Sequence, residues 1–102
     1  MIHVIATIEV HPGKRGDFLV EFHKLVPKVR EEKGCLEYGP TVDVAAGLPR
    51  PTPLREDVVT VIEKWDSLDA LTVHLGAPHM TEYRQRVKDL VKSVQLQVLA
   101  PA

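Results

Sequence analysis

Residues 63–79 read EKWDSLDALTVHLGAPH, and this stretch changes from the spacing of a strand to the spacing of a helix. It contains the only tryptophan of the chain, Trp65, and two of its five histidines, His74 and His79. Upstream, residues 57–65 are rich in β-branched side chains and predict a strand. Downstream, an Asp-Ser pair can cap a short helix, and a Gly-Ala-Pro tripeptide separates it from a second one.

The residues before this stretch predict a strand, a helix and a second strand. Residues 2–10 alternate, with one apolar face made of Ile2, Val4, Ala6, Ile8 and Val10. Residues 14–32 carry a helical apolar stripe made of Phe18, Phe22, Leu25, Val26 and Val29. Pro27 lies within that stripe, so we expect a kink or break near Lys24. Residues 35–44 predict the second strand.

The remaining segments complete the order of elements. A proline-rich loop at residues 46–56 joins the second and third strands, and it is too rich in proline to belong to a central strand. After the tripeptide, an apolar stripe continues the second helix through Met80, Tyr83, Val87, Leu90 and Val91. Alternation at residues 94–98 predicts a final strand.

This order, β-α-β-β-α-β with the second helical region divided in two, predicts an α+β fold. It is the ferredoxin-like split arrangement, with a four-stranded antiparallel sheet and helices on one face. The third strand has apolar side chains on both of its faces, and Ile5 lies opposite the main apolar face of the first strand. Because helices cover only one side of such a sheet, we expect the other side to be buried against a second copy in a homodimer.

The composition is that of one ordinary folded domain spanning residues 1–102, with 44% hydrophobic and 26% charged residues. The net charge of −1 offers no positive field for nucleic acid or an anionic membrane surface. A single cysteine, Cys35, excludes an intrachain disulfide. No apolar run approaches the length needed to cross a bilayer. We expect a cytoplasmic protein that binds neither nucleic acid nor membrane.

The chain also contains three motifs, which are Gly34-Cys35-Leu36-Glu37-Tyr38, then Glu63-Lys64-Trp65, then His74-Leu75 followed after three residues by His79. Together, in this order and spacing, they resemble the antibiotic biosynthesis monooxygenase (ABM) family, and its small quinol-monooxygenase-like members in particular. The resemblance runs from residue 2 to about residue 99. It implies a dimeric α+β barrel with a pocket between the sheet and the helices of each subunit. It also implies oxidation of quinols or polycyclic aromatics by dioxygen, with no metal, flavin or other cofactor.

Such a reaction requires a site that binds a flat aromatic, removes a proton from its hydroxyl group and excludes water. The resemblance therefore indicates His74 as the catalytic base, and Glu63 as a catalytic carboxylate that orients a histidine or a phenol. The substrate-binding residues that it implies are Trp65, Tyr38, Tyr83 and His79.

Each of these residues also has a structural interpretation. His74 fits the exposed end of a short helix, where its ring would face the terminal carbonyl groups. Trp65 fits the hydrophobic core, and Glu63 fits an ion pair with a base such as Lys64 or Arg84. On the structural interpretation the protein would be a dimeric module that binds a small aromatic ligand without turnover, because a fold alone does not determine a function.

A bound metal or haem is less compatible with the sequence. His79 and Glu82 could share a helix face, but two ligands do not make a metal site and His74 lies across a proline break. Haem-degrading relatives of the ABM family need an axial histidine and an asparagine. By the spacing from the tryptophan, those positions fall near Arg84 and at residues 6–7, and neither position has the required side chain.

Overall fold

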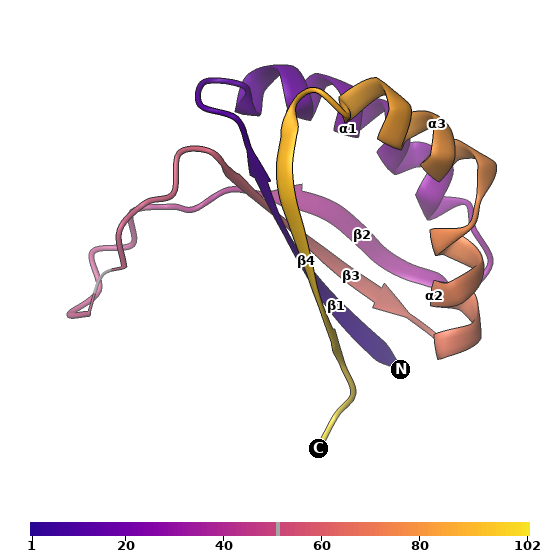
Figure 1. Ribbon diagram of the computed structural model, residues 1–102. Helices are drawn as coiled ribbons and strands as arrows, with labels where there is room; N and C mark the ends of the chain where they lie inside the picture. The colour runs from indigo at the N-terminus through magenta and orange to yellow at the C-terminus, as the bar shows by residue number, and fades with distance from the viewer. Residues whose placement is uncertain (51) are drawn as a thin grey trace.

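The computed structural model describes residues 1–50 and 52–102. In these residues one antiparallel sheet has the strand order β2-β3-β1-β4, and three helices lie against one of its faces (Figure 1). The strands are β1 (Ile2–Val10), β2 (Cys35–Thr41), β3 (Val58–Trp65) and β4 (Val91–Leu99). The helices are α1 (Arg15–Arg30), α2 (Leu68–Leu75) and α3 (Pro78–Val87). The predicted ferredoxin-like order is confirmed, including the division of the second helical region.

The alternation predicted for β1 is visible as alternating burial. Its even-numbered residues from Val4 to Val10 are buried beneath the helices, whereas Ile5 and Thr7 lie on the opposite face. β3 alternates in the same way, and the two strands pair with Ala6 opposite Val61. Because paired residues in an antiparallel sheet project to the same side, the helix-facing residues of both strands form one apolar floor.

The helices begin and end where local chemistry requires. The Ser67 hydroxyl accepts a hydrogen bond from the backbone N–H of Ala70, which caps α2, and Pro78 occupies the first turn of α3. α1 is continuous from Arg15 to Arg30 with Pro27 inside it, so the predicted break near Lys24 is absent. A buried apolar stripe on α1 packs against the sheet and compensates for the hydrogen bond that a proline cannot make.

Two predicted boundaries are wrong. β2 ends at Thr41 rather than at Val44, because the ladder with β3 ends at the pair Thr41–Thr60. α3 ends at Val87, although the apolar stripe continues to Val91. Leu90 and Val91 are still partly buried, but the chain has already turned into β4. Where a helix turns directly into a strand, the apolar residues of the strand can continue the helical spacing, so the pattern does not show where the helix ends.

The turn from α1 into β2 depends on Gly34. Its φ is +86°, a left-handed backbone conformation that residues other than glycine rarely adopt. A Cβ atom at this position would lie 2.5 Å from Asp66 Oδ1 and 2.6 Å from the Cβ of Ala70. Glycine is therefore required both by the backbone and by the close approach of α2, and this turn brings the end of α1 to the site described below.

The loop between β2 and β3 extends away from the helices (Figure 1). Asp43 closes its base, since both carboxylate oxygens accept hydrogen bonds from the Arg55 guanidinium at 2.8 Å. One sequence-based hypothesis is that residues 48–55 cover the cavity or reach a partner subunit. None of the described loop residues lines the cavity, so the first part of that hypothesis is wrong, and Pro51 lies outside the described residues.

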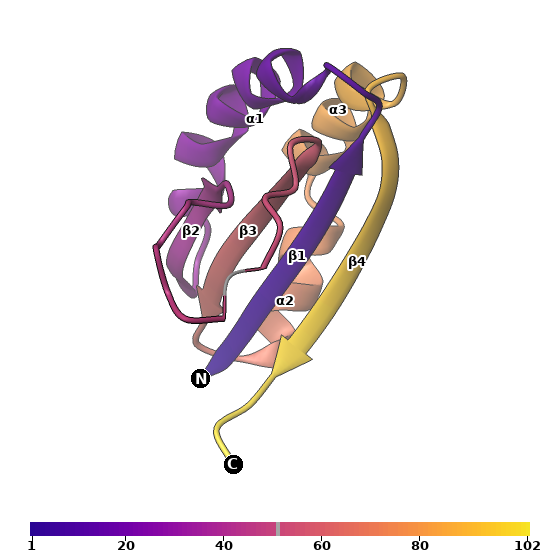
Figure 2. The same ribbon diagram turned by 90° about the vertical axis from the view of Figure 1, so that its left-hand side faces the viewer.

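The sheet face away from the helices carries no covering element within the described part of the chain (Figure 2). Ile5 and Ile62 are paired at its centre and are only partly buried. Thr7, Thr60 and Lys64 lie beside them on the same face. The face is therefore mixed rather than uniformly apolar. None of the helices in residues 1–50 and 52–102 has the length and apolarity to cross a membrane.

Candidate functional site

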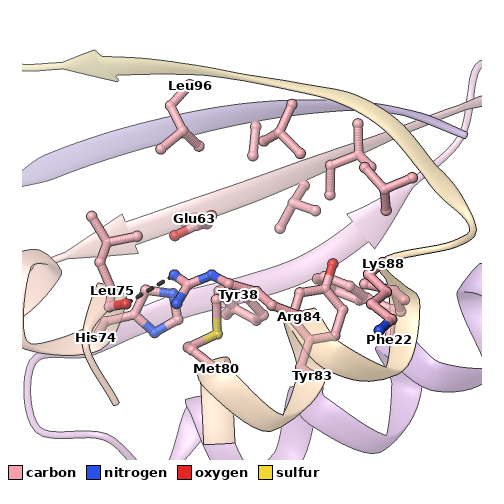
Figure 3. Close-up of a pocket in the computed structure, with 16 residues that line it drawn as sticks. Phe22, Tyr38, Glu63, His74, Leu75, Met80, Tyr83, Arg84, Lys88 and Leu96 are labelled. Carbon is pink, nitrogen blue, oxygen red and sulfur yellow. Dashed lines mark hydrogen bonds between the residues drawn. The ribbon is translucent and has the colours of Figure 1, made fainter. Parts of the chain in front are cut away.

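A cavity of about 330 Å³ lies between the sheet and the helices (Figure 3). Side chains from the floor of the sheet and from all three helices surround it. They are Ala6, Ile8, Phe22, Tyr38, Val61, Glu63, His74, Leu75, Met80, Tyr83, Arg84, Val87, Lys88, Val91, Val94 and Leu96. The lining is mostly aliphatic and aromatic, with few polar groups, as is usual for a pocket that binds a small organic molecule.

The mouth of the cavity lies between α3 and β4. The exposed lining residues are Leu75 at the end of α2, Arg84 on α3, Lys88 directly after α3, and Val94 and Leu96 on β4. Val94 and Leu96 are paired with Ile8 and Ala6, so they project to the helix side of the sheet. Because no described helix covers them, about half of each side chain is exposed. The interior, in contrast, is formed by buried residues of β1, β2, β3 and the three helices.

His74 lies in the wall of the cavity at the end of α2, beside Leu75 and Arg84, and is 1% exposed. Its ring is 4.6 Å from the ring of Trp65 and 5.4 Å from the ring of Tyr38, measured between centroids. The structural interpretation, which places His74 at an exposed helix end, is therefore wrong. The helical period of α2 turns His74 towards the core together with Leu71, while its neighbour Val73 is exposed.

One carboxylate holds both histidines of the HLGAPH segment. His74 Nδ1 and His79 Nε2 lie 2.8 and 2.7 Å from the same oxygen, Oε2 of Glu32. Because a carboxylate accepts hydrogen bonds, each of these nitrogens carries the donated proton. His74 in its neutral form then has Nε2 as its proton acceptor. The tautomer of a buried histidine is set in this way by the partner of its other nitrogen.

Glu32 was not singled out from the sequence, which instead suggested that the proline break would separate His74 from His79. The break has the opposite effect. It ends α2 and starts α3 at Pro78, and the two histidines on either side converge on the turn that follows α1. The available signal was the position of Glu32 next to the Gly34-Cys35 motif, at the end of a strongly amphipathic helix.

Glu32, His74 and His79 are also the group in the described residues that could hold a metal ion, since their ligand atoms all lie within 4.8 Å of one another. Around tetrahedral Zn²⁺, ligand atoms at about 2.0–2.1 Å from the metal lie about 3.3 Å apart. The observed separations of 2.7 and 2.8 Å are hydrogen-bond lengths. We therefore interpret this group as a hydrogen-bonded triad.

Glu63 is a second carboxylate at the cavity, 5% exposed. The indole Nε1 of Trp65 donates a hydrogen bond of 2.9 Å to its Oε1. Burial raises the pKa of Glu63 to about 7, while the bond from Trp65 acts in the opposite direction. The expected ion pair of Glu63 with Lys64 or Arg84 does not form; Lys64 lies instead 3.6 Å from Glu37 on the far face.

Burial also lowers the pKa of His74, and it is the largest cause of the shift. The hydrogen bond and negative charge of Glu32 act in the opposite direction. His74 is consequently a neutral imidazole near pH 7, able to accept a proton, and Glu32 stabilises the imidazolium that would result. Burial raises the pKa of Tyr38 and of Tyr83, so both phenols at the cavity remain protonated and can act as donors.

The structure does not place all the suggested residues in the cavity. His74, Glu63, Tyr38 and Tyr83 line it, with Tyr83 on the cavity side of α3. Trp65 is fully buried behind Glu63 and His74 and is not among the lining residues. His79 lies on the outer side of Glu32 with about a fifth of its side chain exposed. Phe22 and Met80 line the cavity without having been suggested.

The fold and site together describe a small ferredoxin-like domain whose cavity is mostly apolar, with a neutral imidazole and a protonatable carboxyl in its wall. Residues 1–86 match the model of the family described as antibiotic biosynthesis monooxygenase. The chain therefore belongs to the antibiotic biosynthesis monooxygenase family.

Its relatives agree in sequence and in structure. The chain is 40% identical over 103 residues to YgiN of Escherichia coli (strain K12), described as a probable quinol monooxygenase, with 99% of this chain and 98% of YgiN covered. Among solved structures, PA3566 from Pseudomonas aeruginosa superposes with a TM-score of 0.82 at 26% identity, covering 99% of this chain and 93% of that one. Rv0793 from Mycobacterium tuberculosis gives 0.79 at 27%, covering 99% and 94%.

Proposed function

We propose that this protein is a monooxygenase that needs no cofactor and oxidises a quinol or a related cyclic aromatic with dioxygen. The observation that carries the proposal is the placement of a neutral, Glu32-bound His74 inside an apolar cavity. Removal of a hydroxyl proton turns an aromatic alcohol into an electron-rich anion, which can transfer an electron to dioxygen. The likeness to YgiN, named for a quinol monooxygenase, supports the same substrate class.

In this proposal His74 Nε2 takes the proton of the substrate hydroxyl, and the positive charge that forms is stabilised by Glu32. The aromatic ring of the substrate packs against Tyr38 and Phe22, which are themselves stacked with centroids 5.7 Å apart. The mostly apolar lining offers few hydrogen bonds to water, which limits the competition of water for the anion. A dihydroxyaromatic supplies four electrons. One oxygen atom of dioxygen becomes a new ring hydroxyl of the quinone and the other leaves as water, so no external reductant is required.

The direct test is an oxygen electrode with purified protein and a panel of naphthoquinols and hydroxylated polycyclic aromatics, each corrected for its spontaneous oxidation. We expect saturable uptake of one dioxygen per quinol, with the product mass increased by one oxygen atom relative to hydroxyl-free quinone. Saturable binding of these aromatics without any uptake would overturn the enzyme and leave a binding protein in its place.

The variant Glu32→Gln should show how much Glu32 contributes by orienting the His74 ring and how much by raising the basicity of that ring. The amide keeps the shape of the side chain but removes the charge that raises the pKa of His74. We expect kcat/KM to fall by roughly 10- to 100-fold, because general base catalysis depends on the strength of the base. The acidic limb of the pH–rate profile should move to lower pH, because the imidazolium form of His74 loses its Nε2 proton more readily without the charge of Glu32.

The matched control for that variant is Glu31→Gln, which makes the same change at the adjacent, exposed residue. It should leave both kcat/KM and the pH profile unchanged. A Glu32→Gln protein whose rate falls while its acidic limb stays in place would contradict the role given to Glu32, because loss of packing alone does not move a pKa.

We also propose that the protein is a homodimer formed through the uncovered face of the sheet, where Ile5 and Ile62 are paired. Light scattering after size exclusion should give twice the chain mass of 11.4 kDa. Ile62→Glu should shift the protein towards the monomer, because it would place a charge in the buried centre of the interface. Val20→Glu, on an exposed position of α1, should not. A wild-type protein that stays monomeric at high micromolar concentration would exclude the dimer.

A further inference from the structure

We propose that the cavity is specific for aromatics that carry a carboxylate next to the reacting hydroxyl, and that Arg84 at its mouth binds this carboxylate. The inference rests on the proposed function, since it names the substrate class of the same site. The observations that carry it are the position and fixation of Arg84, the balance of charge around the cavity, and the size of the cavity.

Arg84 is held at the mouth by the backbone. Its Nη2 donates a hydrogen bond of 2.8 Å to the carbonyl oxygen of Leu75, the last residue of α2 (Figure 3). That carbonyl directly follows His74 in the chain, so the guanidinium is fixed at the end of the cavity where the base lies. One bond occupies one of five guanidinium N–H groups, and the others are free to meet a ligand. A guanidinium already held in this way loses little freedom on binding a carboxylate.

The cavity wall has more positive than negative charge. Its ionisable residues, apart from the histidine and the tyrosines, are Glu63, Arg84 and Lys88. Within the described residues, neither Arg84 nor Lys88 forms an ion pair with an acidic side chain. This is a local feature, because the whole chain has a net charge of −1. Unpaired cations at an apolar mouth attract an anionic substituent and orient it outward.

Arg86 on the same helix shows what a merely structural arginine looks like here. Its Nε donates a hydrogen bond of 2.9 Å to Glu21 Oε2 on α1, and it does not line the cavity. Arg84 on α3 and Lys88, the residue that follows the helix, are four residues apart and line the cavity together with Met80. Arg86 is therefore neutralised by an acidic side chain away from the cavity, whereas Arg84 and Lys88 remain available to a ligand at the cavity.

The geometry also sets the shape of the ligand. A cavity of about 330 Å³ is at the lower end of the range of ligand pockets, roughly 300–1,000 Å³, so it fits a compact ring system of one or two rings. The hydroxyl must lie at His74, and Arg84 is held beside it, because its Nη2 is bonded to the carbonyl oxygen of Leu75, the residue that follows His74 (Figure 3). A carboxylate that meets Arg84 is then adjacent to the hydroxyl on the ring, as in an ortho-hydroxy aromatic acid.

The test compares the binding of 1-hydroxy-2-naphthoate and 1-naphthol by calorimetry, since both probes can be kept from turnover under anaerobic conditions. Wild-type protein should bind the carboxylated probe at least about tenfold more tightly, as expected for a charge-assisted bidentate pair. Arg84→Gln should remove most of this preference while leaving the affinity for 1-naphthol nearly unchanged. Arg84→Lys should retain part of the preference, because it keeps the charge but not the fork.

Lys88→Gln should reduce the preference by a smaller factor, and Arg86→Gln, with the same loss of charge on the same helix, should leave it intact. Equal affinity of the wild type for the two probes, no binding of either, or an equal loss in Arg84→Gln and Arg86→Gln would overturn the inference. The readout is binding alone. A failure of oxygen uptake with an intact carboxylate preference would therefore overturn the proposed reaction and not this specificity.

Discussion

His74→Asn is expected to lower kcat/KM for quinol oxidation by about 10²- to 10⁴-fold, the usual contribution of a positioned general base. Asparagine is chosen because its side-chain amide can still donate to Glu32 from a position near that of Nδ1, so the orienting hydrogen bond is kept. What is lost is Nε2, the atom proposed to accept the substrate proton. The fall should appear mainly in kcat, because the ring contributes little to substrate binding compared with the apolar lining.

The measurement is steady-state oxygen uptake, accompanied by a thermal melt to show that the variant is folded. His23→Asn is the matched control, because it makes the same substitution at an exposed position of α1, away from the cavity. It should retain wild-type activity. A folded His74→Asn protein with activity within threefold of the wild type would refute the assignment of the base, whatever the substrate.

The second large effect concerns stability. Burial raises the pKa of Glu63 to about 7, from an ordinary value of 4.5. The carboxyl is protonated in both the native and the unfolded state below pH 4.5. Between pH 4.5 and about 7 the unfolded chain has released this proton and the native protein keeps it. The contribution of Glu63 to the free energy of unfolding therefore falls as the pH rises through this window.

A shift of this size corresponds to about 3 kcal/mol, at 1.36 kcal/mol per pKa unit. Glu63→Gln removes the contribution, because an amide has no proton to lose in this range and its oxygen can still accept the bond from Trp65. At pH 8 the variant is expected to be more stable than the wild type by up to about 3 kcal/mol. Near pH 4 the advantage should vanish. Activity should fall in the same variant if Glu63 exchanges a proton with the substrate.

Urea unfolding at pH 4, 5, 6, 7 and 8 gives the required free energies for both proteins. Glu37→Gln is the control, since Glu37 is an exposed carboxylate of β2 that lies 3.6 Å from Lys64. Its stability difference from the wild type should be small and should not grow between pH 5 and 8. If the difference between Glu63→Gln and the wild type were the same at every pH, Glu63 would have an ordinary pKa and the buried-acid interpretation would fail.

Much of the fold was predictable because local patterns report which side of its own element a residue faces. The alternation of β1 predicted its buried residues, whereas β3 is apolar on both faces and its alternation alone left the helix-facing side open. The cap at Ser67 and Pro78 at the start of α3 predicted where two helices begin. Boundaries were less predictable. A stripe that passes from α3 into β4 keeps its apolar residues while the backbone changes direction, so Val87 could not be recognised as the last helical residue.

The candidate site was predictable only in part, because local patterns show which way a residue faces and not which residues it meets. The ABM resemblance drew attention to His74, Glu63, Tyr38 and Tyr83, which line the cavity. It suggested Trp65 as a wall, whereas the indole is buried behind Glu63 and donates to it. Nothing in the spacing of residues indicates whether an inward-facing side chain meets a cavity or a neighbour, because that depends on how closely the elements pack.

The amino-acid sequence by itself determined the order of the strands and helices, the buried faces of β1, α1 and α3, and the family. Only the tertiary structure decided that Glu32 binds His74 and His79, which are 42 and 47 residues away from it in the chain. Periodicity describes a residue within its own element. The packing of α1 against β2 and α3, and the turn at Gly34 beside α2, determine which inward-facing polar groups share a hydrogen bond.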